Sequence, residues 1–254
     1  MKTPLIFDIK RTSSSDGPGI RTVVFFKGCD LSCFWCHNPE GISPLAQLAY
    51  FREKCISCGT CGKVCENALK GCVACGICAE RCPVNARKLY GKQYSIDELF
   101  RIISSDKPYY DATDGGVTFS GGECMLYPEY LAEIAKRCVN DGISVAVDTA
   151  GYVPYESFET VLPYVDLFLY DIKCLDPELH QKGTGKENSL ILQNLERLQR
   201  SGKTIIVRAP VIPGFNDGDE LEKIKVFCLE RDLPLELLKY HPFGEDKKIA
   251  LRSV

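Results

Sequence analysis

The sequence predicts an α/β fold built on a parallel sheet, because strand-like apolar runs alternate with helical patterns along most of its 254 residues. Repeated strand–helix units of this length imply either a doubly wound sheet or a barrel-like sheet with helices outside it. Residues 52–90 interrupt the first crossover and are rich in Cys, Gly and small polar residues, which predicts an inserted minidomain. Residues 1–51 and 91–254 form the predicted main domain.

Six strands and five helices are expected in the main domain. The strand candidates are Thr22–Phe26, Gly116–Ser120, Ser144–Asp148, Leu167–Asp171, Thr204–Ala209 and Leu235–Tyr240. The helical segments are Ile96–Ser104, Glu129–Asn140, Tyr155–Leu162, Leu190–Arg200 and Glu220–Glu230.

Composition excludes several classes of protein. The chain is 45% hydrophobic with a formal net charge of −3, so the basic surface expected of a nucleic-acid or anionic-membrane binder is missing. Its 15 cysteines are concentrated in residues 29–36 and 55–82, which favours metal or cluster ligation over a disulfide scaffold. The apolar stretch Leu5–Phe7 is too brief for a signal peptide. We therefore expect a reducing, cytoplasmic protein.

The first cysteine group, Cys29, Cys33 and Cys36, follows the first predicted strand directly. Thiolates at this spacing can hold three irons of a [4Fe–4S] cubane and leave the fourth iron open for chemistry. The alternative is a structural zinc site closed by His37, but that residue is adjacent to Cys36, where tetrahedral closure is strained. Spacing alone favours the cluster.

The runs Asp16–Arg21 and Cys29–Glu40 resemble the N-terminus of the radical S-adenosylmethionine (SAM) enzymes that activate glycyl radical enzymes, and the resemblance extends to His241. It implies a partial (βα)6 TIM-like barrel and an oxidoreductase whose open iron chelates the amino and carboxylate groups of SAM. Reductive cleavage of SAM then yields a 5′-deoxyadenosyl radical, which takes a hydrogen from a backbone glycine of a partner enzyme. The segment matching Asp16–Gly19 holds that glycine loop, so Asp16 is the candidate peptide contact.

The second cysteine group contains two runs with the same spacing, Cys55-x2-Cys58-x2-Cys61-x3-Cys65 and Cys72-x2-Cys75-x2-Cys78-x3-Cys82. In this tandem ferredoxin pattern the fourth cysteine of each run ligates the other cluster. The predicted ligand sets are Cys55, Cys58, Cys61 and Cys82 for one [4Fe–4S] cluster, and Cys72, Cys75, Cys78 and Cys65 for the other. A pair of zinc sites is the alternative. The spacer Glu66–Gly71 is too short for the usual hairpin, and Glu66 stands where a proline is usual.

The resemblance implies that this insert is a ferredoxin-like minidomain that delivers electrons, so that the protein holds three [4Fe–4S] clusters. The implied partners are a glycyl radical enzyme and a flavodoxin- or ferredoxin-type reductant, with no nucleic acid and no membrane. Two rival functions share part of the pattern. A radical SAM enzyme acting on a small molecule would share the three cysteines, and a non-catalytic electron-transfer protein would share the insert.

The other strand ends carry motifs at the sheet edge where α/β proteins bind ligands. Glycines in Ser120–Glu123 would let backbone approach a ligand. Taken alone, Asp148-Thr149 and Asp171-Ile172-Lys173 could be strand-terminal turns, and Arg208 could be a surface charge. By resemblance the SAM contacts are Trp35, His37, Gly121, Gly122, Glu123, Asp148, Asp171, Ile172, Lys173, Arg208 and His241. A monovalent cation, Na⁺ or K⁺, is implied at Asp148, Thr149, Asp171 and the Leu169 carbonyl; such oxygen ligands suit a hard cation.

The remaining candidates are expected to be structural. His180 lies in a polar helical stretch and is predicted to be at the surface. The scattered cysteines are predicted to be small buried hydrophobes, and they are Cys124, Cys138, Cys174 and Cys228. Few residues follow His241, so we expect the wall near the sixth predicted strand to be exposed or covered by a partner.

Overall fold

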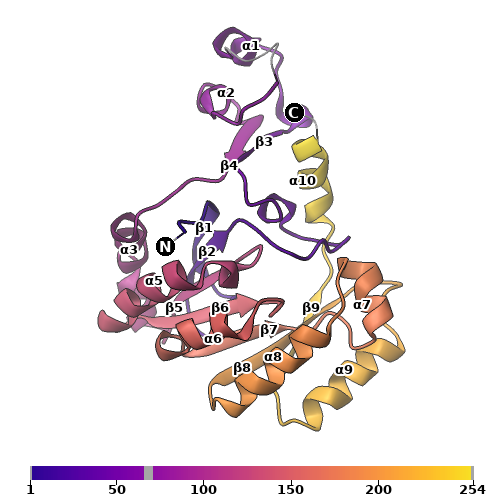
Figure 1. The fold of residues 1–254 in the computed structure, drawn as a ribbon. Helices are drawn as coiled ribbons and strands as arrows, with labels where there is room; N and C mark the ends of the chain where they lie inside the picture. The colour runs from indigo at the N-terminus through magenta and orange to yellow at the C-terminus, as the bar shows by residue number, and fades with distance from the viewer. Residues whose placement is uncertain (1, 66–70, 253–254) are drawn as a thin grey trace.

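A computed structural model describes residues 2–65 and 71–252, and its centre is a seven-stranded sheet in the order β1-β2-β5-β6-β7-β8-β9 (Figure 1). β1 runs antiparallel to β2, and every other neighbouring pair in the sheet is parallel. The strands are β1 (Ile6–Ser13), β2 (Arg21–Phe26), β5 (Gly116–Gly121), β6 (Ser144–Thr149), β7 (Leu167–Asp171), β8 (Thr204–Val211) and β9 (Leu235–Lys239). A mostly parallel α/β fold is thereby confirmed, with all six predicted strands in consecutive order.

β1 was not predicted, because it is an edge strand whose sequence has little apolar signal. Asp8, Lys10 and Arg11 lie on it, and half of its residues are exposed to solvent. β9 forms the other edge and follows the expectation for an exposed wall, since Leu237 is 46% exposed. The sheet is therefore open, with β1 at one edge and β9 at the other.

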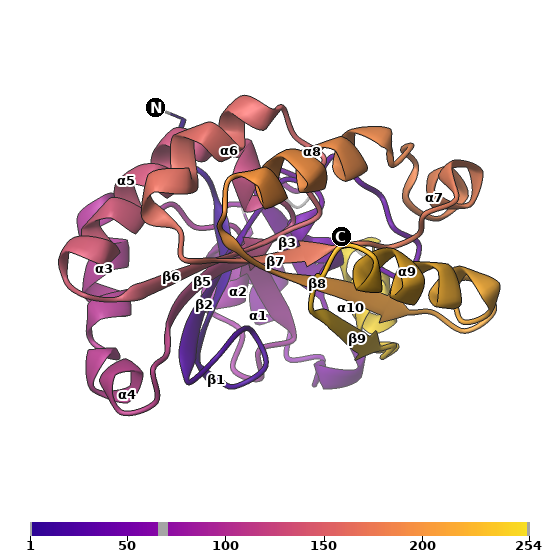
Figure 2. The same ribbon diagram turned by 90° about the horizontal axis from the view of Figure 1, so that it is seen from below.

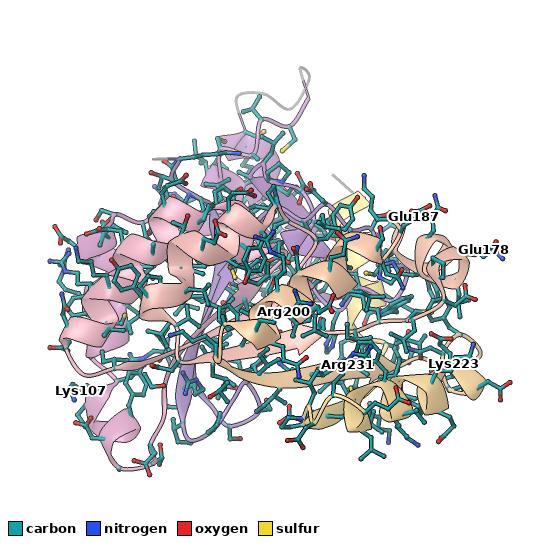
Figure 3. The ribbon with its side chains drawn as sticks, turned by 60° about the horizontal axis from the view of Figure 1, so that its bottom comes forward. Lys107, Glu178, Glu187, Arg200, Lys223 and Arg231 are labelled. Atoms are coloured by element: carbon teal, nitrogen blue, oxygen red, sulfur yellow. The ribbon has the colours of Figure 1, made fainter. Side chains whose placement is uncertain are left out.

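The helices lie mainly along one face of the curved sheet (Figure 2). Those of the main domain are α3 (Ile96–Ser104), α4 (Lys107–Asp111), α5 (Pro128–Asn140), α6 (Tyr155–Val161), α7 (Pro177–Thr184), α8 (Ser189–Arg200), α9 (Asp219–Leu229) and α10 (Phe243–Arg252). All five predicted helices are present within two residues of their expected ends. Glu178, Glu187 and Lys223 are exposed and point outward from these elements (Figure 3).

The core forms where the apolar faces of these helices meet the sheet. Val117, Phe119 and Val147 on the strands are fully buried against Leu131 and Ile134 of α5. α3 begins at a capping box, in which the Ser95 hydroxyl accepts from the Glu98 amide at 3.2 Å and the Glu98 carboxylate accepts from the Ser95 amide at 2.8 Å. The capping box therefore fixes the start of α3, the first helix after the cysteine-rich stretch.

A second, two-stranded sheet carries the cysteine-rich stretch. β3 (Gln47–Tyr50) pairs antiparallel with β4 (Arg87–Tyr90), and the short helices α1 (Thr60–Val64) and α2 (Ile77–Glu80) lie beyond this pair, away from the main sheet (Figure 1). β4 falls inside the predicted insert and β3 lies just before it. Most of the Glu66–Gly71 spacer, including Glu66, lies outside the described residues.

The C-terminal helix α10 connects the two parts of the molecule. It packs against β3 and against η1 (Pro39–Gly41), the short 3-10 helix that follows the first cysteine group. Within residues 2–65 and 71–252, no helix has the length and apolar character needed to cross a membrane.

Candidate active site

A cavity of about 280 Å³ lies at the carboxyl ends of the parallel strands. It is lined by the segment Cys29–Asn38 and by residues that follow β5, β6, β7, β8 and β9. The predicted site residues on its wall are Asp16, Cys29, Cys33, Trp35, Cys36, His37, Gly121, Gly122, Asp148, Thr149, Asp171, Lys173, Arg208 and His241. Residues from widely separated parts of the sequence therefore meet at one place, as the strand-end argument predicted.

The segment that carries the three cysteines is held by backbone hydrogen bonds from both sides. The Cys29 amide donates to the Ile42 carbonyl at 3.0 Å, and the Ser32 and Phe34 amides donate to Thr184 and Gly183 of α7 at 2.8 and 3.1 Å. The Trp35 ring packs on Phe215, with 4.7 Å between ring centroids. This network presents the three thiols to the cavity on a fixed loop.

The chemistry of these thiols fits an iron–sulfur cluster. Burial raises the pKa of Cys29 to about 12 and that of Cys33 to about 11, and it raises the pKa of Cys36 as well. Buried thiolates are stable only beside positive charge, which a metal cluster supplies directly. Lys173 also acts on all three, because its charge lowers each thiol pKa.

The Gly121-Gly122 turn shows why glycine is required after β5. Gly121 has φ of +118°, and a Cβ on Gly122 would overlap the carbonyl oxygens of Gly28 and Gly41. The backbone of the chain itself, at Gly28 and Gly41, therefore packs directly against Gly122, whether or not a ligand is bound. The Gly122 amide donates to Phe26 at 2.8 Å and the Glu123 amide to Gly28 at 2.7 Å, which ties β5 to the start of the cysteine loop.

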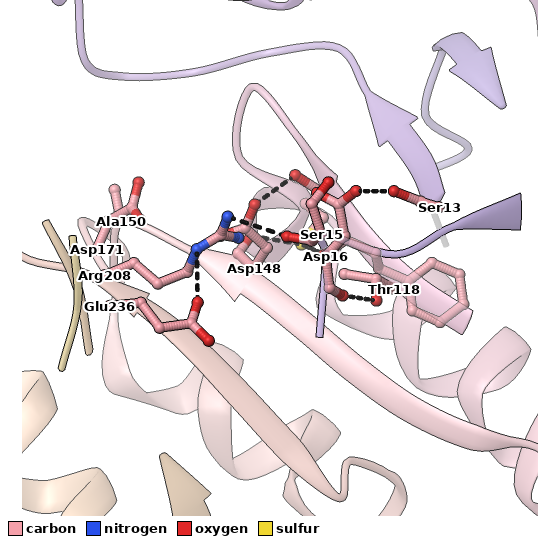
Figure 4. A network of polar contacts seen from close by, with 12 residues as sticks. Ser13, Ser15, Asp16, Thr118, Asp148, Ala150, Asp171, Arg208 and Glu236 are labelled. Carbon is pink, nitrogen blue, oxygen red and sulfur yellow. Dashed lines mark hydrogen bonds and ion pairs between the residues drawn. The ribbon is translucent and has the colours of Figure 1, made fainter. Parts of the chain in front are cut away.

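Two carboxylates and two cations meet at the cavity wall, and Figure 4 shows three of these groups, Asp148, Asp171 and Arg208. Asp148 accepts from the Ser120 hydroxyl at 2.7 Å and lies 3.6 Å from Arg208, while Lys173 lies 2.7 Å from Asp171. Burial, and then the charge of Asp171, raise the pKa of Asp148 to about 6. The pKa of Lys173 is raised despite its burial, because Asp171 stabilises the ammonium form. The wall of the cavity therefore carries balanced charge of both signs.

Asp16 lies at the β1 side of the same network. Its carbonyl accepts from the Thr118 hydroxyl at 2.7 Å, and its carboxylate accepts from the Ser13 hydroxyl and lies 3.8 Å from Lys10. Arg208 reaches the adjacent Ser15 carbonyl at 3.4 Å (Figure 4). The loop between β1 and β2 is thereby bonded to Thr118 on β5 and to Arg208 on β8.

Three predicted ligand contacts are not among the described residues that line the cavity: Glu123, Leu169 and Ile172. The Glu123 carboxylate is 3% exposed and accepts from the Thr149 hydroxyl at 2.8 Å and from the Ala150 amide at 3.0 Å. Burial raises its pKa to about 7. Glu123 thus fastens the end of β5 to the end of β6, and its side chain positions the cavity wall from behind.

The prediction for His180 was wrong, since its side chain is only 1% exposed. Its Nδ1 lies 2.7 Å from the Lys186 carbonyl oxygen, and burial lowers its pKa. The polar residues around it in α7 misled the sequence argument, because α7 turns one face toward the cysteine loop. The four scattered cysteines, by contrast, are buried as predicted.

Sequence reasoning missed the contribution of α10 to the site. Lys247 lies 2.7 Å from the buried Glu40 carboxylate and donates to the Asn38 side chain and the His37 carbonyl, both at 3.2 Å. His37, His241 and Phe243 stack beside it, with ring centroids 5.5 to 6.3 Å apart. Glu245 and Asp246 in the first turn were the available signal for a helix start.

The two cysteine runs of residues 52–90 have matching local geometry. The Ser57 amide donates to Cys55 Sγ and the Ala74 amide to Cys72 Sγ, each at 3.4 Å, and Ser57 and Ala74 both have positive φ. Backbone amides directed at thiolate sulfur are a common feature of cluster loops. The same bond recurs at the end of the second run, where the Ala86 amide donates to Cys82 Sγ at 3.2 Å.

The two predicted ligand sets are called the first cysteine set (Cys55, Cys58, Cys61 and Cys82) and the second cysteine set (Cys72, Cys75, Cys78 and Cys65). Cys55, Cys58, Cys61 and Cys82 line one small cavity together. Cys78 is buried, and its pKa is raised first by burial and then by the charges of its neighbours, which include Cys65, Cys72 and Cys75. Each set contains three cysteines of one run and the fourth cysteine of the other.

Comparison with known proteins agrees with this geometry. Residues 23–227 match the Radical SAM superfamily. The (2S)-3-sulfopropanediol dehydratase activating enzyme of Klebsiella oxytoca is 40% identical, over 97% of this chain and 85% of that protein. The trans-4-hydroxy-L-proline dehydratase activating enzyme of Clostridioides difficile is 41% identical, over 96% and 86%.

The crystal structure of Streptococcus suis SuiB bound to precursor peptide SuiA shares the fold, with a TM-score of 0.57 and 14% identity over 88% of this chain and 39% of that one. The sheet order, the three thiols at its ligand-binding edge and these relatives lead to one assignment. The chain belongs to the radical SAM superfamily and, within it, to the glycyl-radical-enzyme activating enzymes.

Proposed function

We propose that this protein generates a glycyl radical on a partner enzyme, using SAM and a [4Fe–4S] cluster held by Cys29, Cys33 and Cys36. One observation carries the proposal: the three thiols, the Gly121-Gly122 turn and the Asp16 loop all border a single cavity in a chain of this family. When bound, the cluster and SAM supply the electron and the 5′-deoxyadenosyl group with which hydrogen is removed from glycine.

The remaining side chains of the cavity wall would bind and orient SAM. Lys173 and Arg208 offer the positive charge that a carboxylate requires, and the backbone of Gly121 and Gly122 borders the cavity where no side chain intervenes. Trp35, His37 and His241 provide flat rings for packing. Glu123 and Ile172 would act on SAM from behind the wall, by fixing the ends of β5 and β7.

We propose that Asp148, Thr149, Asp171 and the Leu169 carbonyl hold a monovalent cation, Na⁺ or K⁺. Lys173 pairs with Asp171, and the Thr149 hydroxyl donates to Glu123. A cation beside Asp148 would add to the positive charge that Lys173 supplies, and its binding would favour the ionised form of Asp148.

Asp16 would contact the partner's glycine loop at the open side of the barrel. A glycine suits the removal of a Cα hydrogen by the 5′-deoxyadenosyl radical because no Cβ shields its Cα. The Asp16 loop is fastened to Thr118 and Arg208, so it offers a rigid edge against which a peptide can be placed close to the cavity.

We further propose that residues 52–90 form a ferredoxin-like minidomain with two auxiliary [4Fe–4S] clusters, attached to a partial (βα)6 barrel comprising residues 1–51 and 91–254. The matching amide-to-sulfur bonds of the two runs support this assignment. The electron donor would be a flavodoxin- or ferredoxin-type protein of the reducing cytoplasm, where cluster-bearing thiols persist.

Replacing Cys33 with alanine tests the catalytic assignment. In anaerobically reconstituted protein given SAM and dithionite, we expect Cys33→Ala to lower 5′-deoxyadenosine formation at least a hundredfold, because one iron loses its protein ligand. Cys138→Ala is the matched control, since Cys138 is fully buried in α5 away from the cavity. Unchanged cleavage in Cys33→Ala would contradict the assignment, and absence of SAM binding in the wild-type protein would favour a pure electron-transfer function.

A further inference from the structure

Arg87 occupies the junction between the two cysteine sets of the insert. It is the first residue of β4, directly opposite Tyr50 in the β3–β4 register, and its guanidinium lies 4.8 Å above the Tyr50 ring. The side chain is half-buried, and its Nε is buried without a hydrogen-bond partner among the described residues. A buried donor of this kind needs an acceptor or a negative charge close by.

The first cysteine set lies directly beside Arg87. Arg87 lines the same small cavity as Cys55, Cys58, Cys61 and Cys82. Burial acts to lower the pKa of Arg87, but the neighbouring Cys61 and the charge of Cys78 raise it overall. The amide of the preceding residue, Ala86, donates to Cys82 Sγ, so the start of β4 is bonded to this cysteine set.

The second cysteine set packs on the same strand. α2, which carries Cys78, lies against β4, and Gly76 is in close contact with the Leu89 side chain two residues beyond Arg87. The charge of Arg87 also acts on the buried Cys78 thiol. One guanidinium therefore lies within electrostatic range of a ligand from each set.

A cation in this position has a definite effect on cluster chemistry. A reduced [4Fe–4S] cluster carries one more negative charge than the oxidised cluster, so a nearby fixed cation stabilises the reduced form and raises the reduction potential. Hydrogen bonds to cluster sulfur act in the same direction. Because Arg87 is shared, it would raise the reduction potentials of both clusters.

We propose that Arg87 is a positioning residue shared by the two auxiliary clusters, whose guanidinium raises both reduction potentials. This inference rests on the proposed two-cluster function of the insert. The two reduction potentials are those for the gain of one electron by each cluster from an external one-electron reductant.

The test is a redox titration of the full chain in a Cys29→Ala/Cys33→Ala/Cys36→Ala background, followed by electron paramagnetic resonance (EPR) of the reduced clusters. We expect Arg87→Gln to lower the reduced-to-oxidised ratio of both clusters about tenfold at a fixed potential, a shift of about 59 mV for one electron. Lys88→Gln is the matched control, because Lys88 is the exposed next residue of β4, and it should leave the titration unchanged.

The possible failures are distinguishable. Two clusters that form in Arg87→Gln and titrate as in the wild type would overturn the role of Arg87 while leaving the insert assignment intact. Iron absent from the parent background would overturn the insert assignment and this inference together. If Arg87→Gln does not load iron, Arg87→Met is titrated instead. Methionine keeps an apolar stem that can pack on Tyr50 but removes the charge, so we expect both midpoints to fall, and two unchanged midpoints would contradict the shared role.

Discussion

At the residue scale, Glu123 shows how the place of a motif can be predicted while the contacts of one side chain cannot. Sequence reasoning placed the Ser120–Glu123 turn at the ligand edge of the sheet, and the cavity confirms that location for Gly121 and Gly122. The direction of the Glu123 side chain could not be predicted, because it depends on acceptors and donors from β6 that only the folded sheet brings near. The burial of His180 escaped prediction for the same reason.

The raised pKa of Glu123 predicts a pH dependence of stability. Its folded value of about 7 lies above the ordinary value of 4.5, so between these values the native state binds a proton that the unfolded state has released. Stability should therefore fall as pH rises from 5 to 7, by about 1 kcal/mol per pH unit from this group. Glu123→Gln should flatten that slope in urea unfolding of the reconstituted protein at pH 5, 6 and 7. The exposed Glu159→Gln is the control, and an equally steep slope in both variants would argue against this role.

At the element scale, the strands and helices of the repeated βα pattern were predicted closely, including the edge strand β9, whereas β1 and α10 were not predicted. α3 agrees with its expected bounds because a capping box and a buried face coincide there. β1 and α10 owe their structure to neighbours distant in the sequence, namely β2 for β1, and η1 with β3 for α10. Tertiary contacts of this kind leave little trace in the local sequence.

α10 is expected to stabilise the loop that carries the three cysteines. Lys247→Gln leaves the buried Glu40 carboxylate without its cation, which should cost about 2 kcal/mol of unfolding free energy and speed iron loss from the site. Chemical unfolding and chelator-driven iron release measure the two effects. Lys225→Gln, which breaks an exposed ion pair with Glu222, should change either by little. Equal behaviour of the two variants would show that α10 does not hold the loop.

At the scale of the whole molecule, the open sheet, the cavity and the cysteine-rich stretch would divide the work of the proposed function. The Asp16 loop borders the cavity, and the β3–β4 pair carries the cysteine sets away from the main sheet (Figure 1). A parallel sheet followed from the sequence because each βα unit repeats the same local pattern. The bonds from Thr118 to Asp16 and from Arg208 to Ser15 did not, because each joins residues about a hundred or more positions apart.

The most direct test of the central claim is EPR spectroscopy of a glycyl radical enzyme incubated anaerobically with this protein, SAM and a reductant. We predict a SAM-dependent organic radical on the partner that is absent with Cys33→Ala and absent when the loop glycine of the partner is replaced by alanine. One 5′-deoxyadenosine should form for each radical. Cleavage of SAM by the wild-type protein with no radical on any glycyl radical enzyme supplied would contradict the account and favour a small-molecule substrate.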